Sequence, residues 1–139
     1  MERAYIQYTV PLKAEFGQLQ RLAVALAREQ VTVQALSWQA EGEAGFIRFV
    51  TDRTLGVTKA LESLGWTAVQ TPVLSVSVPD RPGELARLFK LLDNSGVGVQ
   101  EMYGATGQAE ACRLILSVDR LERAEQLLAA YNDTFVLLQ

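Results

Sequence analysis

The chain has 139 residues, 49% of them apolar, with 13 basic and 16 acidic side chains and a net charge of −3. This length suits one ordinary domain or two small ones, and the apolar fraction argues against a disordered chain. There is no histidine and only one cysteine, Cys112, so the commonest general base, the usual zinc ligands and an internal disulfide are all missing. We expect a soluble, cytoplasmic protein that spans no membrane, binds no nucleic acid and needs no metal or other cofactor.

The first half of the chain alternates between strand and helix patterns. Apolar residues recur with period two in some segments and at i, i+3, i+4, i+7 in others. A glycine that follows a helical pattern favours a left-handed cap, as Gly65 does here. These patterns predict strands at 4–10, 31–38, 45–51 and 67–70, and helices at 17–29 and 54–64.

The second half shows the same order. One helix begins at Leu85 and ends before the cap at Gly96, and the apolar residues from Ala124 to Tyr131 mark another. Alternating or continuous apolar runs predict strands at 73–78, 98–103, 111–118 and 134–138.

An internal repeat relates the two halves. QVTVQALSW (30–38) matches GVGVQEMYG (96–104) at an offset of 66, and FVTDR (49–53) matches LSVDR (116–120) at an offset of 67. The order βαββαβ therefore occurs twice, and right-handed crossovers place both helices of a copy on one face of its sheet. We predict an α+β fold of two ferredoxin-like units with antiparallel sheets, divided into domains 1–70 and 71–139. Because bare sheet faces or edges need cover, we expect the two copies to pair side by side and the chain to form a homodimer.

The segment VPDRPGEL (78–85) joins a strand to a helix in the second half. Pro82 suits a first helical turn, and Gly83 allows another group to approach the backbone. Free amides at a helix N-terminus attract a carboxylate, while Asp80 can cap the helix or accept a hydrogen bond from an ammonium group. A free amino acid has both charges and fits such a turn. The alternative interpretation is that this segment is an ordinary strand-to-helix connection that binds no ligand, since aspartate, proline and glycine are common in such turns.

The combination of VPDRPGEL, a helix and GVGVQEMYG resembles an ACT domain. The tandem form, with VQALS…GFIRFVTD before VLSVSVPDRPGELA, resembles the small stand-alone double-ACT proteins of bacteria. This resemblance covers almost the whole chain. It implies a non-catalytic, allosteric regulatory protein that binds a free amino acid between two ACT units, against the turn of one unit and the second strand of its neighbour.

The resemblance also implies which residues bind the ligand. In the second copy these are Asp80, Arg81, Pro82, Gly83, Glu84 and Leu85 of the turn, and Gly98, Val99, Gln100, Glu101, Met102 and Tyr103 of the second strand. In the first copy they are Phe16, Gly17, Gln18 and Leu19, which follow Lys13, Ala14 and Glu15, and Thr32, Val33, Gln34, Ala35 and Leu36.

The two copies differ from the family pattern in informative ways. Phe16 replaces the proline of the turn and could fill a cavity there. Thr32 and Gly98 stand where many ligand-binding ACT units have an asparagine at the start of the second strand. The turn of the second copy is the better candidate site.

Three other functions are considered. An RNA-recognition module has the same topology, but its stacking aromatics are two apart, whereas Phe46 and Phe49 are three apart and lie on opposite strand faces. An enzyme lacks any recognisable pairing of a carboxylate with a nucleophile. A ligand-free dimerisation scaffold that regulates a partner protein, such as an enzyme, remains the serious alternative.

For several single residues we expect a structural role in the fold and no direct role in binding. We expect Cys112 to be a small buried residue and Asp52 and Asp119 to cap helices. Trp38, Trp66 and Tyr131 are expected to close hydrophobic cores, whereas Tyr103 borders the proposed site.

Overall fold

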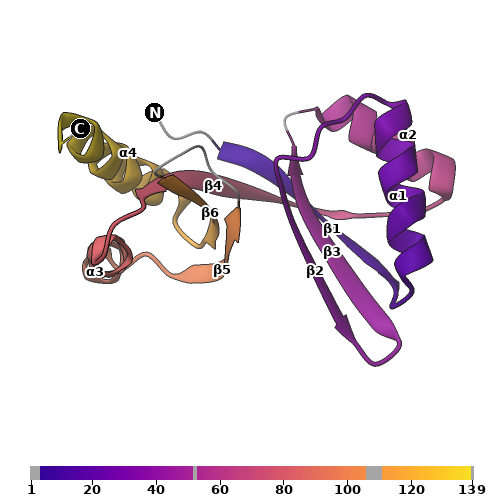
Figure 1. Cartoon of the computed structure of the whole chain (residues 1–139), viewed down its shortest axis with the longest axis horizontal. Coiled ribbons are helices and arrows are strands. Elements are labelled where there is room, and N and C mark those ends of the chain that lie inside the picture. The colour runs from indigo at the N-terminus through magenta and orange to yellow at the C-terminus, as the bar shows by residue number, and fades with distance from the viewer. Residues whose placement is uncertain (1–3, 52, 106–110, 139) are drawn as a thin grey trace. The chain divides into compact units, whose positions relative to one another are not determined.

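The computed structural model describes residues 4–51, 53–105 and 111–138 (Figure 1). The predicted α+β class, with two ferredoxin-like units and antiparallel pairing, is confirmed. The strands follow one another in the hydrogen-bonded order β2-β3-β1-β4-β6-β5. The elements are β1 (Ala4–Lys13), α1 (Phe16–Arg28), β2 (Ala35–Glu41), β3 (Ala44–Thr51), α2 (Thr54–Leu64), β4 (Val69–Pro79), α3 (Glu84–Ser95), β5 (Val99–Ala105), β6 (Ala111–Val118) and α4 (Leu121–Leu138).

Two compact units make up the chain. The first unit is Ile6–Thr71, and the second unit consists of the residues from Pro72 onwards together with the N-terminal end of the chain up to Tyr5. Strand β4 is therefore the last strand of the first unit and the first strand of the second. The division into independent domains 1–70 and 71–139 stays a prediction, because compactness does not show that either half folds alone.

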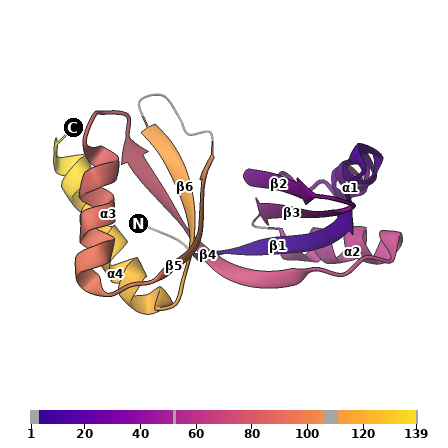
Figure 2. The ribbon, with the colours of Figure 1, turned by 90° about the horizontal axis from the view of Figure 1, so that it is seen from below.

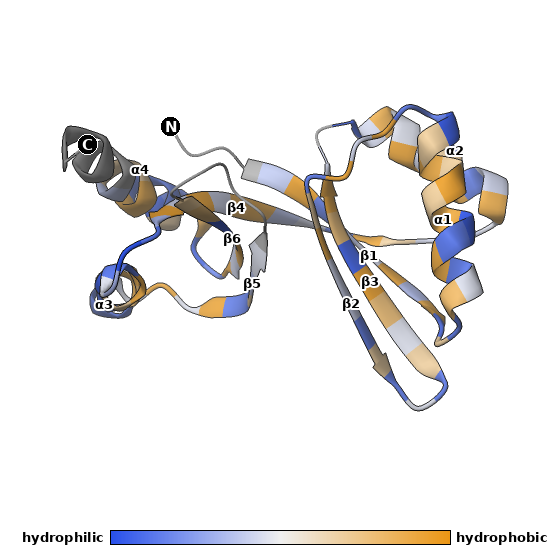
Figure 3. Ribbon diagram, viewed as in Figure 1, coloured by the Kyte–Doolittle hydropathy of each residue, from blue (hydrophilic) through white to orange (hydrophobic). Residues whose placement is uncertain are grey.

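In the first unit, α1 and α2 cover one face of β1, β2 and β3 (Figure 1). Tyr8 of β1 and Phe49 of β3 are fully buried, and their rings stack with centroids 5.4 Å apart. Figure 3 shows hydrophobic residues along these strands and on α1. As predicted, Trp38 and Trp66 pack against this core, which also contains Val10, Leu22, Ala25, Leu26, Ile47, Val57, Ala60 and Leu61.

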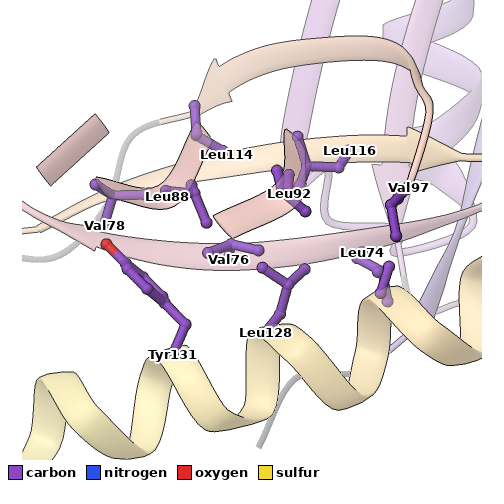
Figure 4. Packing of buried hydrophobic residues seen from close by; sticks show 11 residues of the cluster. Leu74, Val76, Val78, Leu88, Leu92, Val97, Leu114, Leu116, Leu128 and Tyr131 are labelled. Carbon is purple, nitrogen blue, oxygen red and sulfur yellow. The ribbon is translucent and has the colours of Figure 1, made fainter. Parts of the chain in front are cut away.

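In the second unit, α3 and α4 lie side by side on one face of β4, β5 and β6 (Figure 2). Leucine and valine side chains from the strands meet the apolar faces of both helices (Figure 4). Tyr131 of α4 is only 2% exposed and closes this core, as predicted. The buried cluster comprises Leu74, Val76, Val78, Leu88, Leu92, Val97, Leu114, Leu116, Ala124, Leu128 and Tyr131.

The prediction of a final strand at 134–138 is wrong, because these residues continue α4 to Leu138. The spacing of Ala124, Leu128, Tyr131, Phe135 and Leu138 alternates between four and three residues, which is the period of a helix. No glycine or proline interrupts that pattern. Moreover, β4 already has β1 and β6 as its two neighbours, so no position beside β4 is left for another strand.

Strands β1 and β4 are also longer than predicted. The segments 67–70 and 73–78 were expected as separate strands, but β4 runs continuously through Pro72. Proline fixes φ near the value of an extended chain and lacks only the N–H, so it does not have to end a strand. The hydrogen-bonded register of β4 with β6 begins two residues later, at Leu74. Of the described helices, none is both long enough and apolar enough to cross a membrane.

Candidate ligand-binding turn

The turn between β4 and α3 is a tight, hydrogen-bonded connection. Strand β4 ends at Pro79, and the N–H of Arg81 donates to the carbonyl of Pro79 at 2.9 Å. The N–H of Glu84 donates to the carbonyl of Arg81 at 3.3 Å, and α3 begins at Glu84. Pro82 therefore lies in the turn, not in the first helical turn as predicted. Asp80 is exposed, and no side chain caps α3, so Asp80 does not act as the helix cap.

Gly83 is the position where the turn requires a glycine. Its φ is +88°, a left-handed conformation that residues with a Cβ avoid. No heavy atom lies within 4 Å of where a Cβ would stand, so the space beside Gly83 is open. Its backbone N–H and that of Leu85 have no acceptor among the described residues, at the positive end of a twelve-residue helix. The turn thus offers two free donors next to open space.

Glu84 is the centre of a polar cluster at this turn. Its carboxylate accepts hydrogen bonds from Arg81 Nη2 at 3.1 Å, Arg87 Nε at 3.3 Å and the Tyr131 hydroxyl at 3.2 Å. The guanidinium of Arg87 also lies over the Tyr131 ring, 4.5 Å from its centroid. Arg81 and Glu84, two of the predicted ligand contacts, therefore pair with each other.

These contacts change two pKa values. Partial burial of Glu84 raises the pKa of its carboxyl, but the hydrogen bonds from Arg87 and Tyr131 and the charges of Arg87 and Arg81 outweigh burial, so the pKa lies below its ordinary value. Burial, together with the hydrogen bond and charge of Glu84, raises the pKa of Tyr131 to about 12. At neutral pH Glu84 is ionised and Tyr131 is a hydrogen-bond donor.

The predicted second-strand residues of this copy lie along β5 and just before it. The N–H of Gly98 donates to Asp119 Oδ1 at 2.8 Å, and a Cβ at Gly98 would stand 2.6 Å from Asp119 Oδ2. Gln100 lies in a β-bulge and accepts a hydrogen bond from the Ser117 hydroxyl at 3.4 Å. Val99 and Met102 are exposed, at 40% and 45%, and Glu101 and Tyr103 are half-buried.

The first copy forms a different turn. Strand β1 extends to Lys13, and the N–H of Ala14 donates to the carbonyl of Glu43 at 2.9 Å. Phe16 is 79% exposed, so the expectation that it fills a cavity is wrong. Gly17 follows it in the first turn of α1, with Gln18 and Leu19. Thr32, Val33 and Gln34 precede β2, which contains only Ala35 and Leu36 of the predicted set. The second copy remains the better candidate.

Sequence reasoning missed the contacts that three residues make with the predicted site residues. Arg87 lies one helical turn after Glu84, a spacing that does predict an ion pair. Tyr131 is 47 residues from Glu84, and nothing in the sequence links them. The repeated Asp-Arg pair drew attention to Asp119, but its carboxylate binds the Gly98 amide, so the helix-cap interpretation missed its principal contact. Asp52 lies outside the described residues.

The exposure of individual side chains tests the predictions for Cys112 and for the phenylalanines Phe46 and Phe49. Cys112 is exposed, so the prediction of a buried cysteine is wrong. Phe49 is buried against Tyr8, whereas Phe46 is 43% exposed, so they form no joint surface on which RNA bases could stack. Within the described ranges, no group of histidine, cysteine and carboxylate side chains could hold a metal ion.

Solved structures show which architecture this is. A crystal structure of protein BT0572 from Bacteroides thetaiotaomicron has a TM-score of 0.85 at 21% identity, covering 94% of this chain and 90% of that one. The ligand-free regulatory subunit of aspartate kinase from Thermus thermophilus has a TM-score of 0.72 at 18% identity, covering 96% of both chains. The chain has a tandem ACT fold.

The corresponding regulatory subunit from Thermus flavus aligns with a TM-score of 0.70 at 18% identity and the same coverage of 96% of each chain. No family model matches the sequence, and no curated protein matches it. The tandem ACT fold of this chain is therefore visible in its three-dimensional structure and in its internal repeat.

Proposed function

We propose that this protein is a non-catalytic, cytoplasmic regulatory protein that binds a free amino acid between ACT units. The site consists of the Asp80–Leu85 turn of one copy and the β5 strand of a second copy in a homodimer. Binding changes how the protein acts on a partner enzyme. Regulatory subunits of aspartate kinase, which have a similar fold, support a role in regulation.

The open turn at Gly83 is the main observation behind this proposal. A carboxylate beside Gly83 would accept hydrogen bonds from the free N–H groups of Gly83 and Leu85 at the positive end of α3. The exposed carboxylate of Asp80 lies three residues earlier and would accept from the ammonium group. The carboxylate of a free amino acid would thus bind the N–H groups, and its ammonium group would bind Asp80.

The sheet edges support a homodimer. Strands β2 and β5 are the two end strands of the sheet order, and unpaired edge strands tend to associate with other strands. Each edge strand exposes an apolar residue at an equivalent position of the repeat: Leu36 is 55% and Met102 45% exposed. Pairing between two copies would cover these side chains and bring a second chain near the turn.

Thermal melting with each of the twenty amino acids at millimolar concentration tests this function. A ligand at about 100 times its Kd adds roughly 2.7 kcal/mol of stability, which raises Tm by several degrees for a chain of this size. We expect a rise with one amino acid or a related few. Asp80→Ala should abolish this rise without lowering the Tm of the free protein, because Asp80 has no described partner.

Gly83→Ala is the second variant, and Gly96→Ala is its matched control. Both glycines have positive φ, at +88° and +77°, and open space beside them, but Gly96 caps the other end of α3. Both variants should lose stability through backbone strain. Only Gly83→Ala should also lose the ligand response. An equal loss in both variants would place the amino acid elsewhere.

A ligand-free scaffold is the second candidate. It is favoured by Glu84, whose carboxylate already binds Arg81, Arg87 and Tyr131 without any ligand. If none of the twenty amino acids changes Tm while the protein is dimeric by light scattering, the scaffold function replaces the sensor function.

A further inference from the structure

Each unit has a shallow groove between its two helices, and the internal repeat relates the two grooves. The groove of the first unit has a volume of about 390 Å³ and lies between α1 and α2. The groove of the second unit, of about 330 Å³, lies between α3 and α4. Arg21 in one and Arg87 in the other are equivalent at the offset of 66, and both line their grooves.

The equivalent arginines are held in the same way. Arg21 Nη1 donates to Gln18 Oε1 at 3.3 Å, and its guanidinium lies 5.3 Å from the centre of the Trp66 ring. Arg87 makes the corresponding hydrogen bond to Glu84 and lies over Tyr131. An arginine fixed by a hydrogen bond and a ring loses less conformational freedom when it binds an anion.

The partner of each arginine makes the two grooves electrostatically different. Glu84 is ionised and compensates the charge of Arg87. Its counterpart Gln18 is neutral, so among the described residues no acidic side chain pairs with Arg21. Arg28 also lines the α1–α2 groove and has no described partner. No acidic side chain among the described residues lines this groove, and α1 contains none. The groove is thus locally positive in a chain whose net charge is −3.

The lining residues of α1 form a regular stripe. Arg21 and Arg28 are seven residues apart, which places them two turns apart on one helix face, about 10 Å along the axis. Val24 and Ala25 lie between them on that same face, and Val24 is 44% exposed. Across the groove, Ser63 and Leu64 come from the end of α2. Two cations therefore flank an apolar centre.

We infer that the α1–α2 groove is the docking site for an acidic amphipathic helix of a partner protein. A helix with the pattern acidic-x-x-apolar-apolar-x-x-acidic matches this stripe: its carboxylates meet Arg21 and Arg28, and its two apolar residues cover Val24, Ala25 and Leu64. Helix-in-groove recognition uses this i, i+3, i+4, i+7 spacing. The groove is separate from the amino-acid site at Asp80–Leu85, and its role does not depend on that ligand.

The test uses two rhodamine-labelled, alanine-based helical peptides of about 18 residues, a length that supports helix formation. One has glutamates seven apart flanking two leucines, and the other has lysines in place of the glutamates. Fluorescence anisotropy with the full chain at low salt should show at least tenfold tighter binding of the glutamate peptide. Added NaCl should weaken it. Because the whole chain is acidic, non-specific attraction would favour the lysine peptide instead.

Matched variants locate the binding site. Arg21→Gln with Arg28→Gln should weaken binding of the glutamate peptide about tenfold. Arg87 and Lys90 line the α3–α4 groove, so Arg87→Gln with Lys90→Gln removes the same charge from that groove and should not weaken binding. Arg28→Glu alone, at an exposed position, should reverse the preference toward the lysine peptide even if the double variant melts early. Equal binding of both peptides to the wild type, or unchanged affinity in the Arg21 and Arg28 variants, would overturn this inference.

Discussion

Two buried tyrosines show how a single hydroxyl can either weaken or strengthen this fold. The Tyr8 hydroxyl is buried in the first unit and has no hydrogen-bond partner among the described residues. Burial disfavours the charged phenolate and raises the pKa of Tyr8. The Tyr131 side chain is similarly buried in the second unit, but its hydroxyl donates to Glu84. An unmade buried hydrogen bond costs stability, whereas one to a charged acceptor adds to it.

Tyr8→Phe should therefore stabilise the protein. Removing the unpartnered hydroxyl while keeping the ring stacked on Phe49 should add about 1 kcal/mol to the free energy of unfolding, or roughly 3 °C in Tm. Tyr131→Phe is the matched control and should lower Tm, because Glu84 loses a donor. Differential scanning calorimetry of both variants checks the signs. A lower Tm for Tyr8→Phe would show that the hydroxyl does have a partner.

The pKa of Glu84 predicts how stability depends on acid. A carboxyl whose pKa is lowered by folding stabilises the protein above its unfolded pKa, near 4.3, and this contribution disappears as the pH falls through the folded pKa. At pH 7 the wild type should be more stable than Glu84→Gln. This difference should begin to shrink near the unfolded pKa of about 4.3 and disappear only as the pH falls through the lower folded pKa. Urea denaturation between pH 7 and pH 3 measures it. A gap that stays constant with pH would contradict the ionic role of Glu84.

Helix α2 packs so closely on the segment after α1 that a side chain at Gly56 would clash with that segment. A Cβ at Gly56 would stand 2.6 Å from Val31 Cγ2 and 3.3 Å from the carbonyl of Glu29. Gly56→Ala should destabilise the protein, because overpacking costs about 1–3 kcal/mol and outweighs a gain of about 1 kcal/mol in helix propensity. In a Val31→Ala background the same change should become neutral or stabilising. Chemical denaturation of the four proteins gives the coupling energy, and additive effects would contradict the contact.

Most helices and strands of this fold can be predicted from the sequence, because the spacing of apolar residues shows which face of each element is buried. The first three helices were predicted within one residue, and the left-handed caps at Gly65 and Gly96 were predicted correctly. The end of the chain was not, because Thr134–Leu138 is rich in β-branched and aromatic residues and satisfies a strand pattern as well as a helix pattern. Only the sheet order, with β1 beside β4, decides between them.

The candidate site was less predictable than the fold. The turn at VPDRPGEL and the glycine at its tip follow from local chemistry, since proline, aspartate and glycine restrict the backbone within a few residues. Tyr131 joins the turn only through packing of α4 on α3, and Asp119 reaches Gly98 only after β5 and β6 pair. Contacts of this kind depend on tertiary structure, which no local pattern encodes.

At the scale of the whole molecule, the two units share strands. Strand β4 contains the end of the first unit and the beginning of the second, while the N-terminal residues Ala4 and Tyr5 of β1 belong to the second unit. We expect fragments 1–70 and 71–139, expressed separately, to be far less stable than the intact chain, since the cut falls inside β4. Circular dichroism melting of each fragment tests this. Cooperative melting of both fragments near the Tm of the whole chain would establish independent domains.

The placement of Ala4 and Tyr5 in the second unit also bears on the order in which the protein is made. A ribosome synthesises the chain from its N-terminal to its C-terminal end, so Ala4 and Tyr5 emerge before the residues after Pro72 with which they form the second unit. The first unit, Ile6–Thr71, can assemble while translation continues. The second unit cannot bring its N-terminal residues together with those that follow Pro72 until the later half has emerged. During that interval the N-terminal end waits without its native neighbours, and contacts so distant in sequence form slowly.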